Sequence, residues 1–484
     1  MSTSQEHQVD VAVIGAGPGG YHVAIRLAQL GKKVICVDRD EVGGVCLNWG
    51  CIPTKALLHV GEVIRHIERA GTLGLKVPKA EIERETVAKF TSDVVNQNVN
   101  GVKTLFKANG VESIRGEASF KSPTELEVKR DDGSDRIIAR QIVIATGSAP
   151  VDVKAWPRDG ETIINSDDAV RLNRIPKHLL VIGGGVIGLE FATVYRRLGA
   201  EVLVVEMMPQ ILTGTDLEIG KTLGRILKKQ GIEIMLNTKV GTLEKKDKSV
   251  RATINGEGTG GKDETREFDM VLVAVGRRPV TDNLNLKAAG IEVDGHGFIP
   301  VDAQQRTTVP NIFAVGDVTG QPLLAHRAMK QGVVAAEVIN GDRSAAFDPV
   351  AVPNAIYTDP EVATAGLSEE EAKAAGYEVR IGKFPLAASG RARTMNESEG
   401  LIKLVADAKT DLLLGMHIVA PQAESLIGEG IIALEMGATL EDIGLSVHPH
   451  PTFTEGLMDA AEAAHGKAIH LINPKPKTPV GAGS

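Results

Sequence analysis

The sequence is poor in cysteine, in aromatic side chains and in positive charge, and each shortage excludes a class of protein. Three of its 484 residues are Cys, 3% are aromatic, and the formal net charge is -8. Three Cys are too few for a disulfide-rich scaffold. A negative charge with few aromatic residues leaves neither a basic footprint nor stacking surfaces for nucleic acid. We therefore expect no nucleic-acid partner.

Long hydrophobic runs are also missing. No apolar stretch approaches the roughly 18 residues of a membrane span, and residues 1–7 lack the basic start and apolar core of a secretory signal. We expect no membrane association and a cytoplasmic location. With 43% hydrophobic residues, a chain of this length is predicted to form about three globular domains.

Two of the three cysteines, Cys46 and Cys51, lie five residues apart in the segment 43–55. A bridge that closes so short a loop adds little stability, so a dithiol that cycles between redox states is the better hypothesis. Two alternatives stay open: a metal site, although no second Cys-x-x-Cys or His cluster accompanies the pair, and two reduced thiols without chemistry. We expect no metal, and we expect Cys36 to be a strand-core residue without function.

The chain opens with a strand, a glycine turn and a helix. An apolar strand at 9–14 runs into Gly15, Gly17 and Gly20, and a helix is predicted through Leu30. Asp38 ends the next strand, where it can accept hydrogen bonds from a ribose. This arrangement is typical of a dinucleotide site, because the glycines admit a pyrophosphate to the helix N-terminus.

The same pattern recurs in the second quarter of the chain. A strand at 179–182 leads into Gly183, Gly185 and Gly188, and the strand after the helix ends at Glu206. The sequence therefore predicts two dinucleotide sites. A carboxylate at Glu206, with no positive charge at 207–209, favours NAD over NADP because it would repel a 2'-phosphate.

Three further strands end in small-residue turns near these sites, at 142–148, 270–277 and 311–317. Asp317 closes the last of them, and it alternatively caps the following segment. Residues 255–265 are predicted to be an exposed hairpin tip. A boundary to a C-terminal domain is expected at 349–353, and a disordered tail after Asn473.

Taken together, residues 43–55, both glycine turns, 145–148, 316–317 and 448–455 resemble the flavoprotein disulfide reductases, over about 8–472. This resemblance implies an α/β fold with two Rossmann-like dinucleotide-binding domains, for FAD and NAD, and a C-terminal α+β dimerisation domain. The implied division is as follows: 1–149, first part of the FAD domain; 150–280, NAD domain; 281–349, second part of the FAD domain; 350–472, dimerisation domain; 473–484, tail.

The resemblance also implies the roles of individual residues. Cys46 exchanges with the substrate, Cys51 lies against the flavin, and His450 of the other subunit is the base, oriented by Glu455. From the residues alone, Glu455 could instead hold a helix start. The residues implied to contact FAD are Gly15, Gly17, Gly20, Asp38, Gly44, Lys55, Ala118, Gly147, Asp317 and Ala325. Those implied on the NAD side are Gly183, Gly185, Gly188, Glu190, Glu206, Val240, Ala274, Gly276 and Arg277, with Glu190 also expected to pair with Lys55.

The activity implied is FAD-dependent oxidation of protein-bound dihydrolipoamide by NAD. The implied partners are a second copy of the chain, the lipoyl domains and acyltransferase core of 2-oxo acid dehydrogenase complexes, and the glycine cleavage system. Glutathione reduction is disfavoured by Glu206, and mercuric ion reduction by the absence of Cys after Cys51. A scaffold with dispensable redox activity is the alternative of another class; it would not need the two cysteines, His450 and Glu455 together. Trp49, Pro449 and Phe453 depart from the usual family pattern.

Overall fold

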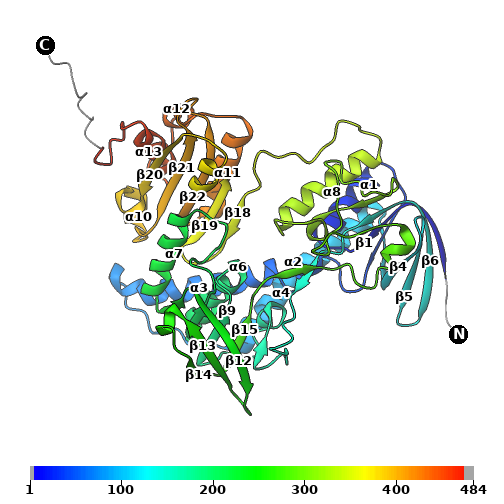
Figure 1. Ribbon diagram of the computed structural model, residues 1–484, viewed down its shortest axis with the longest axis horizontal. Coiled ribbons are helices and arrows are strands. Elements are labelled where there is room, and N and C mark those ends of the chain that lie inside the picture. The colour runs from blue at the N-terminus through cyan, green and yellow to red at the C-terminus, as the bar shows by residue number, and fades with distance from the viewer. Residues whose placement is uncertain (1–4, 474–484) are drawn as a thin grey trace.

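The computed structural model describes residues 5–473 and shows three lobes, each built on its own sheet (Figure 1). The predicted tail after Asn473 lies outside the described residues. Within residues 5–473, no helix combines the length and the apolar character needed to cross a membrane.

The first lobe contains a sheet in the order β3-β2-β1-β6-β5-β4, with β17 also paired to β6. Its strands β3, β2, β1, β6 and β17 are parallel, and β4 and β5 extend it antiparallel. The bounds are β1 Glu6–Ile14, β2 Val34–Asp38, β3 Glu112–Arg115, β4 Glu117–Ser122, β5 Glu125–Arg130, β6 Gly133–Ile144 and β17 Ile312–Ala314. Helices α1 Pro18–Gln29, α4 Arg84–Asn109 and α8 Ala325–Ile339 supply side chains to the core on one face of this sheet.

The second lobe repeats this design with a five-stranded parallel sheet, β11-β10-β9-β15-β8. An antiparallel sheet β12-β13-β14 packs beside it, and β7 and β16 form a separate two-stranded sheet. The strand bounds are β7 Ser148–Pro150, β8 Ile163–Ile164, β9 His178–Ile182, β10 Glu201–Val205, β11 Ile232–Met235, β12 Thr238–Lys245, β13 Val250–Gly256, β14 Glu264–Phe268, β15 Met270–Val273 and β16 Arg277–Pro279. The helices are α5 Ser166–Ala169, α6 Val186–Arg197 and α7 Leu217–Lys229.

The third lobe carries an antiparallel sheet in the order β18-β19-β22-β21-β20, covered by helices. Its strands are β18 Asn354–Ile356, β19 Glu361–Gly366, β20 Val379–Pro385, β21 Leu401–Asp407 and β22 Leu413–Ala420. Its helices are α9 Glu369–Ala374, α10 Gly390–Thr394, α11 Ala423–Glu435, α12 Leu440–Leu445 and α13 Glu455–Ala464.

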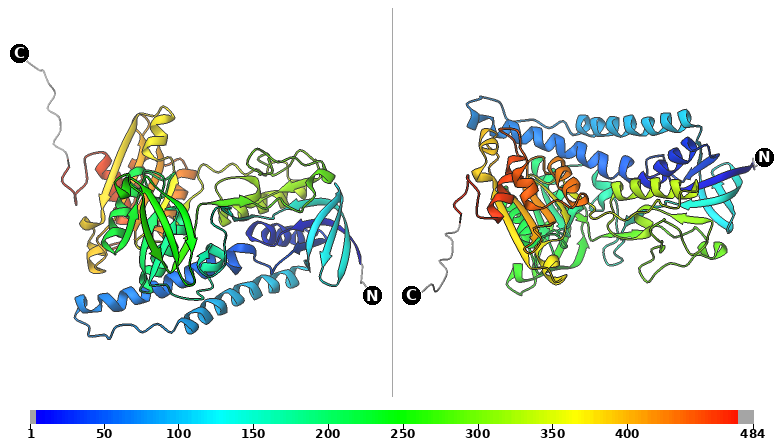
Figure 2. Two further views of the ribbon diagram at one scale, coloured as in Figure 1. Left: turned by 60° about the horizontal axis from the view of Figure 1, so that its bottom comes forward. Right: turned by 90° about the horizontal axis from the view of Figure 1, so that it is seen from above.

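Two helices carry the cysteine segment and join the lobes. α2 (Gly44–Asn48) ends just before α3 (Cys51–Arg69), which packs against both α4 and α6. Figure 2 shows α3 and α4 side by side along one flank of the molecule. Through these contacts α3 connects the first lobe with the second. Short 3-10 turns complete the chain: η1 Ala70–Leu73, η2 Glu257–Thr259, η3 Leu286–Ala289, η4 Gly316–Thr319 and η5 Leu386–Ala388.

Candidate active site

The glycine turn between β1 and α1 lines a cavity of about 620 Å³. A Cβ atom on Gly15 would lie 2.3 Å from the carbonyl oxygen of Ala145, and one on Gly20 would lie 1.8 Å from the carbonyl oxygen of Gly15. Gly17 is open by contrast, since its nearest neighbour would be the Cα of Gly44 at 3.8 Å. No side chain caps α1 and none in its first turn is acidic. The turn therefore fits the pyrophosphate of FAD, which needs close backbone approach and free amides.

Asp38, at the end of β2, lies at the same cavity. Its Oδ2 accepts from the backbone N–H of Ala16 at 2.6 Å and its Oδ1 from that of Asp40 at 2.9 Å. Burial raises the pKa of this carboxyl, against the lowering effect of the two N–H donors. The backbone thus fixes the carboxylate in place and leaves lone pairs free, which the predicted role in ribose binding requires.

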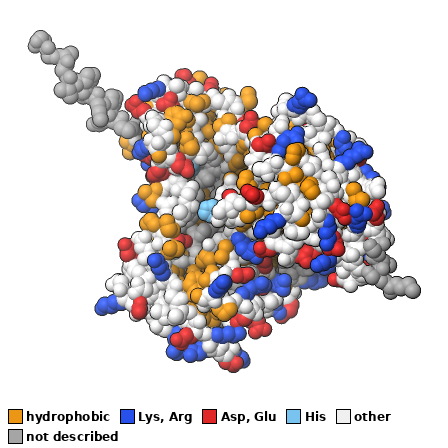
Figure 3. Space-filling model, turned by 45° about the vertical axis from the view of Figure 1, so that its right-hand side comes forward, with side chains coloured by type: hydrophobic (Ala, Val, Ile, Leu, Met, Phe, Trp, Pro, Cys, Tyr) orange, Lys and Arg blue, Asp and Glu red, His pale blue; other side chains and the backbone are white. Residues whose placement is uncertain are grey.

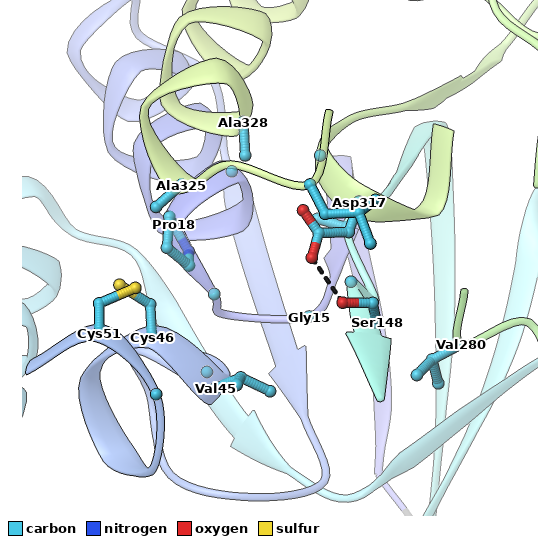
Figure 4. Close-up of a pocket in the computed structure, with 18 of the residues that line it drawn as sticks. Gly15, Pro18, Val45, Cys46, Cys51, Ser148, Val280, Asp317, Ala325 and Ala328 are labelled. Carbon is cyan, nitrogen blue, oxygen red and sulfur yellow. Dashed lines mark hydrogen bonds between the residues drawn. The ribbon is translucent and has the colours of Figure 1, made fainter. Parts of the chain in front are cut away.

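Cys46 and Cys51 are free thiols at the wall of the cavity, and Figure 4 shows their sulfur atoms next to each other. Cys46 lies within α2, and Cys51 is the first residue of α3. No side chain caps α3, so the positive end of its helix dipole faces Cys51. Such a position favours a thiolate.

The two thiols differ in acidity. A hydrogen bond from Cys46 lowers the pKa of Cys51, and the charge of Lys55 lowers it further, while burial and the charge of Glu190 act in the opposite sense. The same hydrogen bond, together with burial, raises the pKa of Cys46. In the reduced pair the negative charge therefore belongs on Cys51, and Cys46 keeps its proton.

Lys55 lies one helical turn after Cys51, so both side chains are on the same face of α3. Its Nζ donates to both carboxylate oxygens of Glu190 at 2.9 Å. The side chain of Glu190 is 5% exposed, and it comes from α6 in the second lobe. The expected Lys55–Glu190 pair is present, and it joins the two nucleotide-binding lobes beside the dithiol.

A second polar chain crosses the cavity opposite the thiols. Arg277 donates from Nε to Ser148 Oγ and from Nη2 to Ser148 O, both at 2.8 Å. Ser148 Oγ in turn donates to Asp317 Oδ2 at 2.5 Å, as Figure 4 shows. No side chain caps η4, where Asp317 lies. Asp317 is thus held toward the cavity, and the capping alternative does not describe its hydrogen bonds.

The second glycine turn repeats the geometry of the first. A Cβ atom on Gly188 would lie 2.1 Å from the carbonyl oxygen of Gly183, whereas Gly185 has no atom within 4 Å. Glu206, 9% exposed, follows β10 and accepts from the N–H of Gly184 at 2.7 Å and from that of Met208 at 2.8 Å. Glu206 therefore occupies the position in the second lobe that Asp38 occupies in the first, after the strand that follows the glycine turn and its helix. Its carboxylate fits an unmodified ribose.

His450 lies in the third lobe, where its Nδ1 contacts Glu455 Oε1 at 2.7 Å. Because a carboxylate only accepts, Nδ1 carries the proton and Nε2 is left free to take one. The other oxygen of Glu455 accepts from the N–H of Thr452 at 2.8 Å. Helix α13 begins at Glu455 itself, after Thr454, and no side chain caps it, so the contact with Thr452 lies before the helix. Although partial burial opposes it, the Thr452 N–H and His450 lower the pKa of Glu455.

The structure brings most of the predicted FAD-side residues together. The members of that set that line the cavity are Gly15, Gly17, Asp38, Gly44, Lys55, Ala118, Gly147, Asp317 and Ala325. Gly20 lies behind the turn instead. Two residues predicted on the NAD side, Glu190 and Arg277, line the same cavity, which agrees with their contacts to Lys55 and Ser148.

The remaining predicted NAD-side residues do not line this cavity; they are Gly183, Gly185, Gly188, Glu206, Val240, Ala274 and Gly276. Nor does His450, whose side chain is 79% exposed. His326 lines the cavity, and its Nε2 contacts Pro353 O at 2.7 Å. Sequence reasoning missed Tyr357, which also lines the cavity. No local signal marks it, because it comes from a third segment far from both glycine turns.

Comparison with known proteins places the chain in a family. The family model described as pyridine nucleotide-disulphide oxidoreductase matches residues 9–332, and the model of the dimerisation domain of the same family matches residues 352–461. A dihydrolipoyl dehydrogenase of Thermus scotoductus is 50% identical over 96% of this chain and 99% of its own length. The dihydrolipoyl dehydrogenase of Geobacillus stearothermophilus is 41% identical, over 96% and 98%.

Solved structures agree with this placement. LpdA from Mycobacterium tuberculosis superposes with a TM-score of 0.86 at 26% identity, covering 94% of this chain and 99% of that one. A flavoprotein disulfide reductase, RclA from Escherichia coli, in a Cu(II) complex, gives a TM-score of 0.84 at 27% identity over the same shares. The predicted fold class and resemblance are confirmed, and so is the cofactor pair FAD and NAD. The chain belongs to the pyridine nucleotide-disulphide oxidoreductase family.

Proposed function

We propose that the chain catalyses the oxidation of protein-bound dihydrolipoamide to lipoamide with reduction of NAD. The observation that carries the proposal is the pair Cys46 and Cys51 at the cavity wall, with the thiolate-stabilising Lys55 one turn away. Relatives at 41% and 50% identity that bear the name dihydrolipoyl dehydrogenase support the choice of substrate. FAD, when bound, would accept an electron pair from the reduced Cys46–Cys51 pair and pass it as hydride to a nicotinamide.

The sulfur exchange begins with the oxidised Cys46–Cys51 disulfide. His450 Nε2 accepts a proton from one substrate thiol, and the resulting thiolate attacks the sulfur of Cys46. A bond forms between substrate and Cys46, the Cys46–Cys51 bond breaks, and Cys51 leaves as a thiolate. The helix dipole of α3 and Lys55 stabilise this leaving group.

The second substrate thiol completes the exchange. Its sulfur attacks the substrate sulfur bound to Cys46, so that the bond between substrate and Cys46 breaks and cyclic lipoamide is released. The proton of this second thiol passes to the departing sulfur of Cys46, and the first proton stays on His450. Glu455 holds the Nδ1 proton of His450 throughout and stabilises the imidazolium form. The electron pair of the substrate dithiol then resides on the Cys46 thiol and the Cys51 thiolate.

His450 is proposed to act on the dithiol of a partner subunit in a homodimer. Within one chain it is highly exposed and does not line the cavity that holds the thiols. The matched dimerisation domain supports two copies, and so do exposed apolar side chains of the third lobe, namely Ile432, Met436, Leu445 and Val447. Burial of these side chains in a dimer would bring His450 of one subunit to the dithiol of the other, where a single chain provides no such base.

The wider setting is part of the proposal. Partners are the lipoyl domains and acyltransferase core of 2-oxo acid dehydrogenase complexes, with the glycine cleavage system as a further lipoyl source, and the location is cytoplasmic. The predicted division of the chain at 149, 280, 349 and 472 is retained as a proposal. It agrees with the sheets described above, since β17 returns to the first sheet after the second lobe.

The test is NADH formation by the FAD-loaded protein on addition of dihydrolipoamide and NAD, with NADP as the control. Cys46→Ser and Cys51→Ser are expected to keep FAD and lose turnover, while Cys36→Ser, in the core of β2, serves as the matched control for substituting a cysteine. FAD binding without dihydrolipoamide-dependent reduction in the parent would refute the substrate, and it would favour a tether. Turnover by either variant would refute the dithiol role.

A further inference from the structure

Tyr357 lies at the cavity, and the proposed reaction gives it no role. The centroid of its ring lies 4.4 Å from Lys55 Nζ, within the range of a cation–π contact. Its backbone N–H donates to Glu190 Oε1 at 3.0 Å. One residue of the third lobe therefore contacts both members of the ion pair that joins the first two lobes, through two different groups.

The ring of Tyr357 restricts the position of the Lys55 ammonium in a way that Glu190 alone does not. A lysine side chain has four flexible carbon segments, so an ion pair with one carboxylate leaves the ammonium free to swing around its partner. Lys55 is 31% exposed at its side chain, so solvent gives it room to do so. Glu190 sets the distance of the ammonium from the carboxylate. The ring of Tyr357 is a second contact, and the two together fix the position of the ammonium.

The position of the Lys55 ammonium affects the acidity of Cys51. Lys55 lowers the pKa of Cys51 and Glu190 raises it. The net effect on Cys51 therefore depends on where the ammonium sits between the thiolate and the carboxylate. A small displacement of Lys55 toward solvent would leave the opposing charge of Glu190, which is fixed by burial and by the Tyr357 N–H, uncompensated.

The surroundings of Tyr357 keep its hydroxyl protonated, so that Lys55 meets a neutral aromatic ring. Burial, followed by the charges of Glu424 and Glu361, raises the pKa of the Tyr357 hydroxyl. Glu361 accepts from the Glu424 N–H at 3.3 Å, and burial beside Glu424 raises the pKa of Glu361 to about 9. At neutral pH this carboxyl pair thus carries one negative charge rather than two.

We propose that Tyr357 is a positioning residue that holds the Lys55 ammonium between Cys51 and Glu190 and thereby stabilises the Cys51 thiolate of the reduced enzyme. The proposal rests on the proposed function only in requiring a dithiol that is reduced and reoxidised. It assigns the effect to the aromatic face and to no other part of the side chain. The backbone N–H to Glu190 is common to every variant at this position except proline.

The test measures the pKa of the Cys51 thiol in FAD-loaded protein that carries Cys46→Ser, so that one thiol titrates at the site. The rate of alkylation of Cys51 by iodoacetamide is followed against pH, with the modified peptide identified by mass spectrometry. Tyr357→Leu is expected to raise the pKa by roughly 0.5 to 1 unit, the size of a cation–π contact. Tyr357→Phe, which keeps the ring, is expected to leave it unchanged.

Controls separate this role from a structural one. Tyr377→Leu replaces an exposed tyrosine of the same lobe and is expected to have no effect on the pKa. If Tyr357→Leu fails to retain FAD, Tyr357→Met gives the same comparison with an unbranched side chain. Equal Cys51 pKa values in the parent, Phe and aliphatic variants would overturn the proposal, as would a rise in Tyr357→Phe equal to that in Tyr357→Leu.

A second readout uses the intact dithiol and no lipoamide. In a glutathione redox buffer, Tyr357→Leu is expected to make the Cys46–Cys51 potential more negative, because the reduced form loses thiolate stabilisation. An unchanged potential would contradict the proposal. Neither measurement uses dihydrolipoamide, so a parent enzyme that does not oxidise that substrate would refute the proposed function and leave this inference standing.

Discussion

Replacing Glu206 by Ser is expected to relax the preference for NAD over NADP. The carboxylate is held by two backbone N–H groups, from Gly184 and Met208, and it is largely buried. Ser carries no charge and keeps a hydroxyl group that can accept a hydrogen bond. Gln is a poorer choice, because its NH₂ group would face one of the two N–H donors.

The size of the effect follows from electrostatics. Two unit charges about 5 Å apart, at an effective dielectric constant of about 20, interact by roughly 3 kcal/mol. Repulsion of this size against the 2'-phosphate of NADP corresponds to a discrimination on the order of 100-fold. Loss of one ribose hydrogen bond costs NAD about 1 kcal/mol. The ratio of kcat/KM for NAD to that for NADP is therefore expected to fall by about two to three orders of magnitude, chiefly through a gain with NADP.

The assay is NADH or NADPH formation with saturating dihydrolipoamide at two ionic strengths. Glu201→Gln is the matched control, since Glu201 begins the same strand and is exposed, and it is expected to leave the ratio unchanged. If Glu206→Ser lowers kcat/KM equally with both coenzymes, the carboxylate serves only to hold the turn. That result would refute the electrostatic argument.

Three further predictions concern stability and FAD binding. Lys403→Met is expected to lower the free energy of unfolding by about 3–5 kcal/mol, because it leaves the fully buried Asp216 unpaired; urea denaturation measures this, and a loss below about 1 kcal/mol would speak against it. Burial beside Glu424 raises the pKa of Glu361 to about 9, so the native state keeps a proton that the unfolded state releases above about pH 4.3, and stability falls as pH rises between these values. Glu361→Gln is expected to flatten that fall, measured by denaturation at pH 6 and pH 9, and parallel curves would contradict it. Gly20→Ala is expected to purify without FAD, because its Cβ would meet a carbonyl oxygen at 1.8 Å. Gly101→Ala, with open space around it, is expected to keep FAD. The absorbance spectrum measures the bound flavin, and equal flavin in both variants would exclude the steric argument.

Local sequence predicts hydrogen-bond partners only where the two residues are close along the chain. Glu455 is five residues from His450, and their contact is expected from spacing and resemblance and is present. Lys55 and Glu190, 135 residues apart, were paired from the resemblance alone. The contacts of Arg277 with Ser148 and of Lys403 with Asp216 were not foreseen. Each of these joins different strands or lobes, and nothing in the local sequence specifies such a partner.

The sequence by itself determined the two glycine turns, the dithiol and the family, because each depends on residues a few positions apart. The steric demand at Gly20, whose Cβ would meet the carbonyl oxygen of Gly15, is settled within six residues of chain, and the placement of Cys51 and Lys55 within one helical turn. Only the tertiary structure decided which charge belongs to which thiol and which side chain holds Lys55. Those outcomes depend on burial and on the approach of Tyr357, 302 residues after Lys55 along the chain, because electrostatic energies are set by distance in space and by exclusion of water.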